Sequence, residues 1–359
     1  MSGPAFEFLL FGHDTIECSY YLRATGGQGI DFERLGVEKE ALRQMKGRDP
    51  KVVRLGSMEF LLQRYGSSSG YPFVLDCPEF AIQCGEFNSP PFYVTYRSAA
   101  LWEHGAWGMH ERFLEWARGL GMHEYASETL GRTDFTFDYY LPAVEFNEDS
   151  FVSLAALDSK HRHDRVLRGV TFGKGDVVLR IYDKVAEIQE KSGKVWFFQL
   201  WGRSDNVWRI EWQARKDLLR RFGIRTFADL AALQGDALRY LAHEHDTLRV
   251  PNGDANRSRW ALHPLWVDLQ EQIGKLEAQG VHRVVDVEAA IRERLTRLAV
   301  SIYGYVKRVG ALHCVLRGEP TVSFEDAMGR LEQQLRWVHD PLTWAADLEK
   351  RIEQTRLGQ

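Results

Sequence analysis

The sequence predicts an α+β protein whose core is an antiparallel sheet built from two pseudo-repeated β-α-β-β blocks, followed by a C-terminal α-helical region. Three observations carry this prediction. Up to about residue 225, short runs rich in β-branched and aromatic residues are separated by single helical patterns. The order strand, helix, strand, strand begins a second time near residue 126. Beyond about residue 226 only helical periodicity remains, so we expect three domains, at 1–125, 126–225 and 226–359.

The first block reads as strands around two helices. A helical pattern at 31–46 brings Phe32, Leu35 and Leu42 to one side, and a longer helix ends at Gly119-Leu120-Gly121. Pro90 and Pro91 break the chain before that helix. The predicted elements, in order, are a strand at 13–23, the helix at 31–46, strands within 51–64, at 71–76 and at 79–84, and the helix at 97–120.

The second block repeats this order with shorter pieces. Its predicted elements are a strand at 131–141, a short helix at 147–157 capped by Asn147 or Asp149, a hairpin of 166–173 with 176–184, and a strand at 207–215. The helical region that follows is predicted at 216–223, 226–245, 263–278, 286–308, 324–338 and 343–355.

Composition is that of an ordinary globular protein, with 44% hydrophobic and 27% charged residues. No apolar run approaches the roughly 20 residues of a membrane span, and the first residues lack the basic region of a signal peptide. The four cysteines are scattered without a CxxC pair. We therefore expect a cytoplasmic protein with reduced thiols and no membrane contact.

The stretch DVVLRIYDK carries the first chemical signal. Because side chains alternate along a strand, Arg180, Tyr182 and Lys184 share one face, while Leu179 and Ile181 point into a core. Flanking cations stabilise a phenolate and hold a phosphate in front of it. If a helix begins at Asp183 instead, Lys184 leaves this face and Glu187 replaces it.

Two further strands have the same polarity. One face of 131–141 carries Asp134 and Asp138, and one face of 207–215 carries Arg209, Glu211 and Arg215. If the strands are neighbours, these groups meet Tyr182 on one surface. Carboxylates suit Mg²⁺ or Mn²⁺, a tyrosine oxygen can attack phosphorus, and cations neutralise the developing charge. A ladder of cross-strand ion pairs, such as Asp134 with Arg180 or Arg209, explains the same residues without chemistry.

Charge adds a hint about the partner. The net charge is −4, yet residues 160–225 hold about twice as many Lys and Arg as Asp and Glu. Aromatic residues 196–198 and Trp201 lie among cations of this segment, as in sites that stack unpaired bases. A hydrophobic dimer interface accounts for the aromatics equally well.

The segments RTDFTFDYY, GVTFGKGDVVLRIYDKVAEI and WRIEWQAR, in this order, resemble the trans-acting replication initiators of rolling-circle plasmids and filamentous phages. In that family a glycine-containing hairpin leads into an R-[IL]-Y-[DE]-K strand, followed shortly by a glutamate. The matching positions here are Arg180 to Lys184 and then Glu187. The resemblance covers roughly residues 130–310. The Gly173–Asp176 turn is shorter than the usual turn of the family, which leaves open how DNA phosphate is held there.

The resemblance implies a metal-dependent endonuclease of an HUH-like or saddle-like fold that nicks one strand at an origin, remains joined to the 5′ phosphate through tyrosine, and rejoins the strand. Its implied partners are origin DNA that is single-stranded at the nick, a host helicase and, as an open alternative, a second copy of the chain. The first domain would recognise DNA, the second would carry the chemistry, and the helical region would contact DNA, the helicase or the second copy. The implied roles are catalysis for Tyr182, Arg180 and Lys184, DNA binding for Arg209, Lys174 and Arg215, and Mg²⁺ or Mn²⁺ binding for Asp134, Asp138, Glu211 and Glu187.

Other interpretations remain open at this point. A non-catalytic, sequence-specific DNA-binding regulator could keep the same basic segment, and a nuclease could use metal-bound water, with Asp176 and Glu211 as ligands. Two H-x-H pairs, His161 with His163 and His243 with His245, lack the apolar middle residue of a typical metal-binding strand.

Overall fold

The computed structural model describes residues 6–25, 29–45, 50–144, 146–163, 166–281 and 287–356. These residues form two compact units, Met1–Val284 and Val285–Gln359. The predicted boundary at 125/126 falls inside strand β7, and the boundary at 225/226 lies within the first unit. The first two predicted domains therefore share one body, and their separate roles stay predictions.

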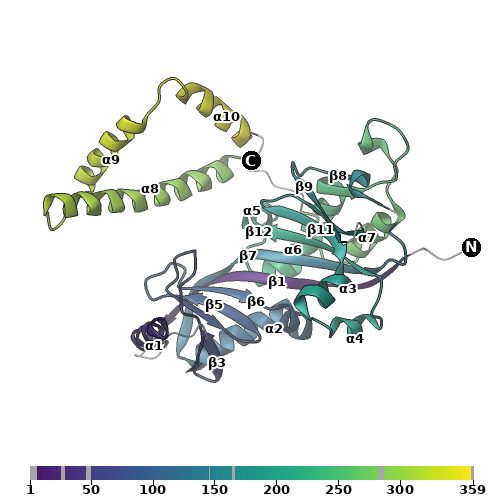
Figure 1. The fold of residues 1–359 in the computed structure, drawn as a ribbon, viewed down its shortest axis with the longest axis horizontal. Coiled ribbons are helices and arrows are strands. Elements are labelled where there is room, and N and C mark those ends of the chain that lie inside the picture. Colours follow the sequence, from purple (N-terminus) through teal and green to yellow (C-terminus); the bar gives the residue numbers. More distant parts are fainter. Residues whose placement is uncertain are drawn as a thin grey trace, which may run out of the picture. The chain divides into compact units, whose positions relative to one another are not determined.

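One antiparallel sheet of 11 strands organises the first unit, in the order β2-β3-β4-β5-β6-β1-β7-β12-β11-β10-β9 (Figure 1). The expected mixed architecture with an antiparallel sheet and C-terminal helices is confirmed. Both blocks contribute to a single sheet, and the internal repeat stays a prediction. Its strands are β1 (Glu7–Ala24), β2 (Lys51–Leu55), β3 (Met58–Leu62), β4 (Phe73–Asp76), β5 (Phe80–Cys84), β6 (Phe92–Tyr96), β7 (Met122–Tyr140), β9 (Asp158–His163), β10 (Val166–Phe172), β11 (Val177–Asp183) and β12 (Val207–Arg215).

Helices flank the sheet and follow it. Those of the first unit are α1 (Phe32–Gln44), α2 (Ser98–Gly119), α3 (Lys184–Glu187), α4 (Phe197–Trp201), α5 (Lys216–Arg221), α6 (Phe227–Tyr240) and α7 (Pro264–Gly274). Those of the second unit are α8 (Val287–Arg317), α9 (Phe324–Val338) and α10 (Trp344–Arg356).

The structure differs from the prediction in one helix and in strands that were not predicted, such as β6. The helix expected at 147–157 is wrong, because Asn147 caps only one 3-10 turn (Glu148–Ser150) before β8 (Phe151–Ser153), which pairs with β13 (Asp246–Leu248). Buried Phe151 gains more by packing against Phe172 and Trp266 than a further helical turn would provide. Strand β6 was not predicted; it begins directly after Pro91, where the proline can occupy the position before the first ladder hydrogen bond.

The two faces of the sheet differ in character. Helices α2, α6 and α7 pack on the apolar face, where ring contacts join Tyr20 to Phe113, Tyr96 to Phe227 and Trp212 to Trp266. The opposite face of β7, β11 and β12 carries the polar side chains. A bulge in β1 between His13 and Thr15 shifts the alternation of that strand.

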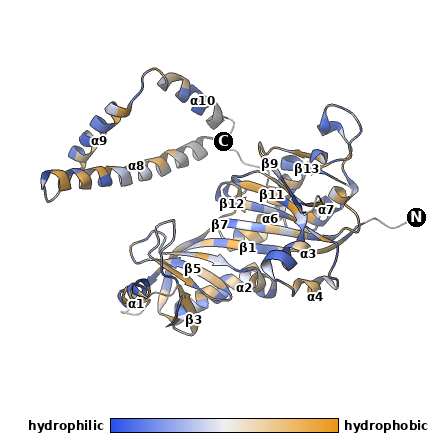
Figure 2. Ribbon diagram, viewed as in Figure 1, coloured by the Kyte–Doolittle hydropathy of each residue, from blue (hydrophilic) through white to orange (hydrophobic). Residues whose placement is uncertain are grey.

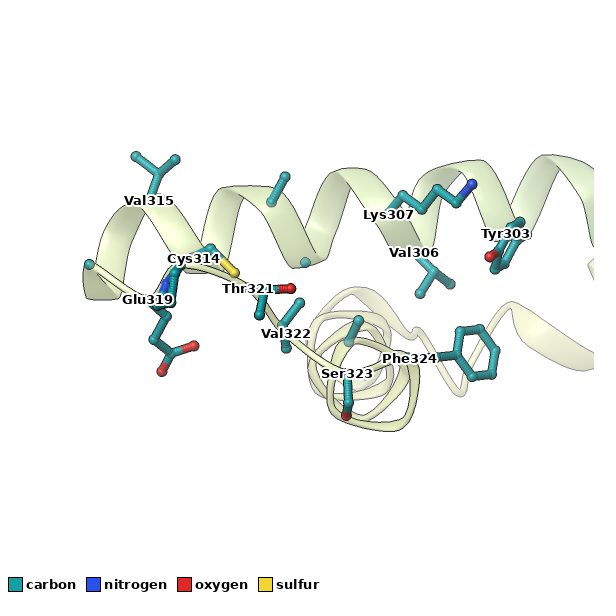
Figure 3. Close-up of a pocket in the computed structure, with 15 residues that line it drawn as sticks. Tyr303, Val306, Lys307, Cys314, Val315, Glu319, Thr321, Val322, Ser323 and Phe324 are labelled. Atoms are coloured by element: carbon teal, nitrogen blue, oxygen red, sulfur yellow. The ribbon is translucent and has the colours of Figure 1, made fainter. Parts of the chain in front are cut away.

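The second unit contains α8, α9 and α10, each of which carries both hydrophobic and hydrophilic residues (Figure 2). A groove of about 650 Å³ lies between α8 and the segment that leads into α9, lined among others by Tyr303, Val306 and Val322 (Figure 3). Across the described parts of both units, none of the helices is long and apolar enough to cross a membrane.

His13 is a half-buried histidine with a buried Nε2 atom, in the longest strand pairing of the sheet, between β1 and β7. Its ring packs between Phe11 and Phe135, with centroid distances of 5.8 and 5.5 Å. Burial lowers the pKa of His13 to about 4, and the neighbouring Gln234 opposes this effect only in part. The folded protein therefore holds the imidazole neutral, while the unfolded chain protonates it below about pH 6.5.

We predict that this histidine makes folding pH-dependent. The folded pKa lies below the unfolded value, so its stabilising contribution is present above pH 6.5 and is lost as the pH falls toward 4. Between pH 7.5 and 5 the wild type should lose about 2 kcal/mol of unfolding free energy relative to His13→Gln, measured by urea denaturation. An equal pH dependence in the two proteins would contradict the neutral, buried imidazole.

Candidate active site

Three neighbouring strands bring the predicted polar residues to one face of the sheet. Tyr182 on β11 lies opposite Arg209 on β12, which in turn lies opposite Asp138 on β7. Arg180 lies opposite Glu211 in the β11–β12 ladder. The alternation expected from the sequence is therefore confirmed, and the phenol, two carboxylates and two guanidinium groups share one surface.

The Tyr182 hydroxyl donates a hydrogen bond of 2.9 Å to Glu211 Oε2. The other oxygen of Glu211 accepts a bond of 2.9 Å from Arg180, which also donates to Gln213 at 3.0 Å. Burial, and next the negative charge of Glu211, raise the pKa of Tyr182 well above its ordinary value. The expectation of a phenolate stabilised by its flanking cations is therefore wrong, because the nearest charge to the hydroxyl is a carboxylate.

Gly169 explains why Tyr182 fits against the neighbouring strand. It lies opposite Tyr182 in the β10–β11 ladder. A Cβ atom at this position would lie 2.8 Å from Tyr182 Cβ and 2.9 Å from the Ile181 carbonyl oxygen. A larger residue would push β11 aside, so the glycine allows the close approach.

Lys184 begins helix α3 rather than ending the strand, yet it does not leave the site. Its side chain is 2% exposed, and its ammonium lies 5.5 Å from the centroid of the Tyr182 ring. It donates a hydrogen bond of 2.7 Å to Glu187. Burial, and next the charge of Arg209, lower the pKa of Lys184. The expectation that a helix start would remove Lys184 is wrong, because the first helical residue still projects back over the strand.

Arg209 is the centre of the polar cluster. It is fully buried, and its guanidinium binds Asp138 through bonds of 2.6 and 2.9 Å and Asp14 through a bond of 2.8 Å. Its Cζ atom lies 4.6 Å from the ring centroid of Phe197. Arg209 therefore holds two carboxylates and does not present itself to DNA at the surface. The other two cations assigned to DNA, Lys174 in the hairpin turn and Arg215 at the end of β12, are exposed.

Asp14 belongs to this cluster, although sequence reasoning did not find it. Its oxygens accept bonds from Arg209, from Lys194 at 3.0 Å and from Ser98 at 2.8 Å. Burial alone would raise the pKa of Asp14, but Arg209, Lys184 and Lys194 together hold it well below the usual value. The bulge in β1 brings Asp14 to the polar side, and simple alternation cannot predict a bulge.

Aromatic residues close one end of the site. Phe197 and Trp201 are buried and form a small core with Val185 and Val207. Trp201 also donates a hydrogen bond of 2.9 Å to Asp138. These two rings therefore pack against the Arg209 cluster. Because they are buried, they are not free to stack unpaired bases, which was one interpretation of the sequence.

The four carboxylates assigned to a metal are separated by their cationic partners. Asp134 binds Arg132 at 2.8 Å, and Asp138, Glu211 and Glu187 bind Arg209, Arg180 and Lys184, respectively. Among the described residues, no three His, Cys, Asp or Glu side chains converge as metal ligands do. In this arrangement the residues do not fit a divalent ion, because each would have to release a cation first.

The histidine pairs give no metal site within the described residues either. His161 lies on β9 and near Thr171, and the side chain of His163 lies outside the described residues. His245 contacts Asp246 at 2.9 Å, in the turn that follows α6.

The fold and site define a mixed α+β protein with a polar, tyrosine-bearing sheet face. No family model and no curated protein matches the chain. One solved structure that is similar to it is a rolling circle replication initiator protein from Geobacillus stearothermophilus, with 17% identity, a TM-score of 0.45, and coverage of 76% of this chain and 100% of that one. This structure is of the class that the sequence resembles. At this distance the likeness assigns no activity and no residue roles.

We predict that Mg²⁺ or Mn²⁺ alone leaves the melting temperature unchanged, relative to NaCl at equal ionic strength. A metal at a hundred times its Kd would add about 2.7 kcal/mol and raise Tm by about 5 °C or more. No such shift is expected while cations occupy the carboxylates. A shift of this size in the absence of DNA would show that the carboxylates release their partners and gather around the ion.

Proposed function

We propose that this protein initiates rolling-circle replication by cutting and rejoining one strand of origin DNA through Tyr182. The observation that carries the proposal is the hydroxyl of Tyr182, bonded to Glu211 at 2.9 Å on a face that also holds Arg180 and Lys184. A nucleophile, a proton acceptor and cations for a phosphate are the groups that phosphodiester transfer to tyrosine needs. The matching sequence motif supports the same residue.

Each proton that moves in the proposed step has a donor and an acceptor. The Tyr182 oxygen attacks phosphorus while its proton passes to Glu211 Oε2, 2.9 Å away. The bond from phosphorus to the 3′ oxygen breaks, and the leaving oxygen takes a proton from the ammonium of Lys184. The 5′ phosphate stays on the tyrosine, and attack by a 3′ hydroxyl reverses the step to rejoin the strand. Burial, which lowers the pKa of Lys184, makes its ammonium a better acid.

Of the cations named at this site, Arg180 and Lys194 have the most accessible side chains, 35% and 27% exposed. A phosphate at Tyr182 would compete with Glu211 for Arg180, and this competition would free the carboxylate to accept the proton. Origin DNA that is single-stranded at the nick, a helicase and a second copy of the chain are the partners we propose. The Mg²⁺ or Mn²⁺ requirement implied by the sequence resemblance is left to the metal test above, and no step here depends on it.

A second candidate function is a non-catalytic, sequence-specific DNA-binding regulator. The closed set of ion pairs around Tyr182, together with its raised pKa, favours this alternative. A regulator would retain DNA and form no covalent adduct under any condition. A nuclease that uses water would instead cut without an adduct.

We predict that Tyr182→Phe retains DNA but abolishes the covalent protein–DNA adduct, scored by denaturing gel on origin DNA. Tyr93→Phe is a matched control, because the Tyr93 hydroxyl also donates to a sheet glutamate, Glu17, at 2.5 Å. The control should form the adduct at the wild-type level. An adduct that persists in Tyr182→Phe, or disappears in Tyr93→Phe alone, would refute the assignment.

We further predict that Glu211→Gln slows adduct formation about 100-fold or more at pH 7, because the amide cannot take the phenol proton. Since burial keeps Tyr182 protonated, the rate of the variant should rise about tenfold per pH unit as hydroxide replaces the carboxylate, while the wild-type rate stays nearly flat. Glu17→Gln is the control, since Glu17 binds Tyr93 and Arg132. Parallel pH profiles for wild type and Glu211→Gln would exclude Glu211 as the base.

A further inference from the structure

A cavity of about 390 Å³ lies where the first turns of α2 and the middle of α6 meet β1. Strand β6 pairs with β1 only at Ile16–Tyr20, so in the described structure no strand covers this edge of β1 near Gly12. Helix α2 covers it instead, with a break at Gly105, whose backbone (φ 72°, ψ 169°) leaves the helical conformation. The cavity has the size of a small-molecule site.

The walls of this pocket are mainly flat and apolar. Trp102 and Trp107 come from α2, Phe11 from β1, and Phe227 and Leu230 from α6. Trp107 is 52% exposed and stands at the surface. A ring that enters the pocket would therefore meet aromatic faces, as bases do when they stack on protein side chains.

Three buried polar atoms in the walls have no hydrogen-bond partner: Trp102 Nε1, Gln234 Oε1 and His13 Nε2. Gln234 lies close enough to His13 to oppose in part the effect of burial on its pKa, so these two side chains are neighbours in the wall. The indole is a donor, the amide oxygen an acceptor, and a neutral imidazole nitrogen can be either. Unpartnered groups of this kind cost stability, so a ligand that pairs with them would recover it.

The pocket adjoins the Tyr182 site through one side chain. Trp102 packs against Gly12, where a Cβ atom would lie 2.7 Å from the indole ring. The same indole contacts Phe197 at 5.3 Å between centroids and lies 6.0 Å from Arg209 Cζ. Arg209 in turn pairs with Tyr182 across the ladder. Gly12 lies opposite Thr136 on the polar face of the sheet, so the Trp102 ring that covers Gly12 separates the pocket from the face that carries Tyr182.

We infer that this pocket receives one unstacked base of the single strand held at Tyr182. A nucleobase is flat and apolar on its faces and carries donors and acceptors on its edge, which matches both the rings and the three unpartnered atoms. The inference rests on the proposed function, whose substrate it defines more closely: the cut strand would be fixed by a base as well as by its phosphates.

Two variants test the pocket. Ala231→Phe places a ring at its mouth, and Ala228→Phe, also an exposed alanine of α6 but outside the lining, is the control. Gln234→Leu removes the unpartnered oxygen at nearly constant volume, so its melting temperature should equal or exceed that of the wild type. This second variant keeps the test valid if Ala231→Phe fails to fold.

The measurement compares the affinity of full-length protein for oligo(dT) and for an abasic oligonucleotide of equal length. Wild type and Ala228→Phe should prefer the base-bearing strand. Ala231→Phe should lose at least about fivefold of this preference, the loss expected for one stacked base, and Gln234→Leu about two- to tenfold, the loss expected for one hydrogen bond. In addition, an oligonucleotide carrying 5-iodouracil should photocrosslink to Trp102 or Trp107, located by mass spectrometry.

The outcomes separate the pocket from the nicking activity. An unchanged base preference in both pocket variants, or crosslinks confined to other aromatic residues, would refute base binding in this pocket. The adduct assay would still decide the role of Tyr182. A wild type that does not distinguish the two oligonucleotides refutes base binding there as well. A lost preference in the variants, together with no adduct in the wild type, would keep the pocket and refute the nicking function.

Discussion

The buried guanidinium of Arg209 is the interaction on which the rest of the site depends. It joins three strands, because Asp138 belongs to β7, Asp14 to β1 and Arg209 itself to β12. Trp201 of α4 binds the same Asp138 carboxylate. Removing one member would leave a buried charge without its partner, a loss of about 3 to 5 kcal/mol. The position of Tyr182, opposite Arg209 in the ladder, is fixed by this network.

As a consequence, the charged groups of the site are already paired with one another in the absence of a substrate. The carboxylates of Asp138, Glu211 and Asp134 each bind a guanidinium, and Tyr182 is kept as a neutral phenol. Burial also raises the pKa of Asp134 to about 6. Such a site does not hold a preformed nucleophile. In the mechanism we propose, a phosphate first competes for the half-buried guanidinium of Arg180, and this competition would couple activation of the phenol to the presence of DNA.

Strand chemistry made the polar face predictable from the sequence, because alternation along β7, β11 and β12 requires only that each run be a strand. What could not be predicted depends on contacts between distant segments. Asp14 reaches Arg209 through a bulge, and Trp102 reaches Arg209 from a helix more than 100 residues away in the chain. The sequence also could not predict which cation each carboxylate binds, because it shows only that acidic and basic residues lie near one another. The predicted metal ligands therefore received no support from the structure, in which each of these carboxylates binds a cation.

Two hydrogen-bonded sets of tyrosine, glutamate and arginine lie on the sheet, and a comparison of the two shows what is specific to the set that contains Tyr182. Tyr93 donates to Glu17, which binds Arg132, as Tyr182 donates to Glu211, which binds Arg180. Both phenols have a raised pKa for the same reasons, burial followed by the charge of the glutamate. A bonded Tyr–Glu–Arg trio is therefore not in itself a sign of catalysis. The difference lies in Lys184, which covers the ring of Tyr182, and in the Arg209 cluster beside it. In the proposed step the ammonium of Lys184 protonates the leaving oxygen and the Arg209 cluster holds the strands in place, so the chemistry we propose follows from the surroundings of Tyr182 more than from its hydrogen bond.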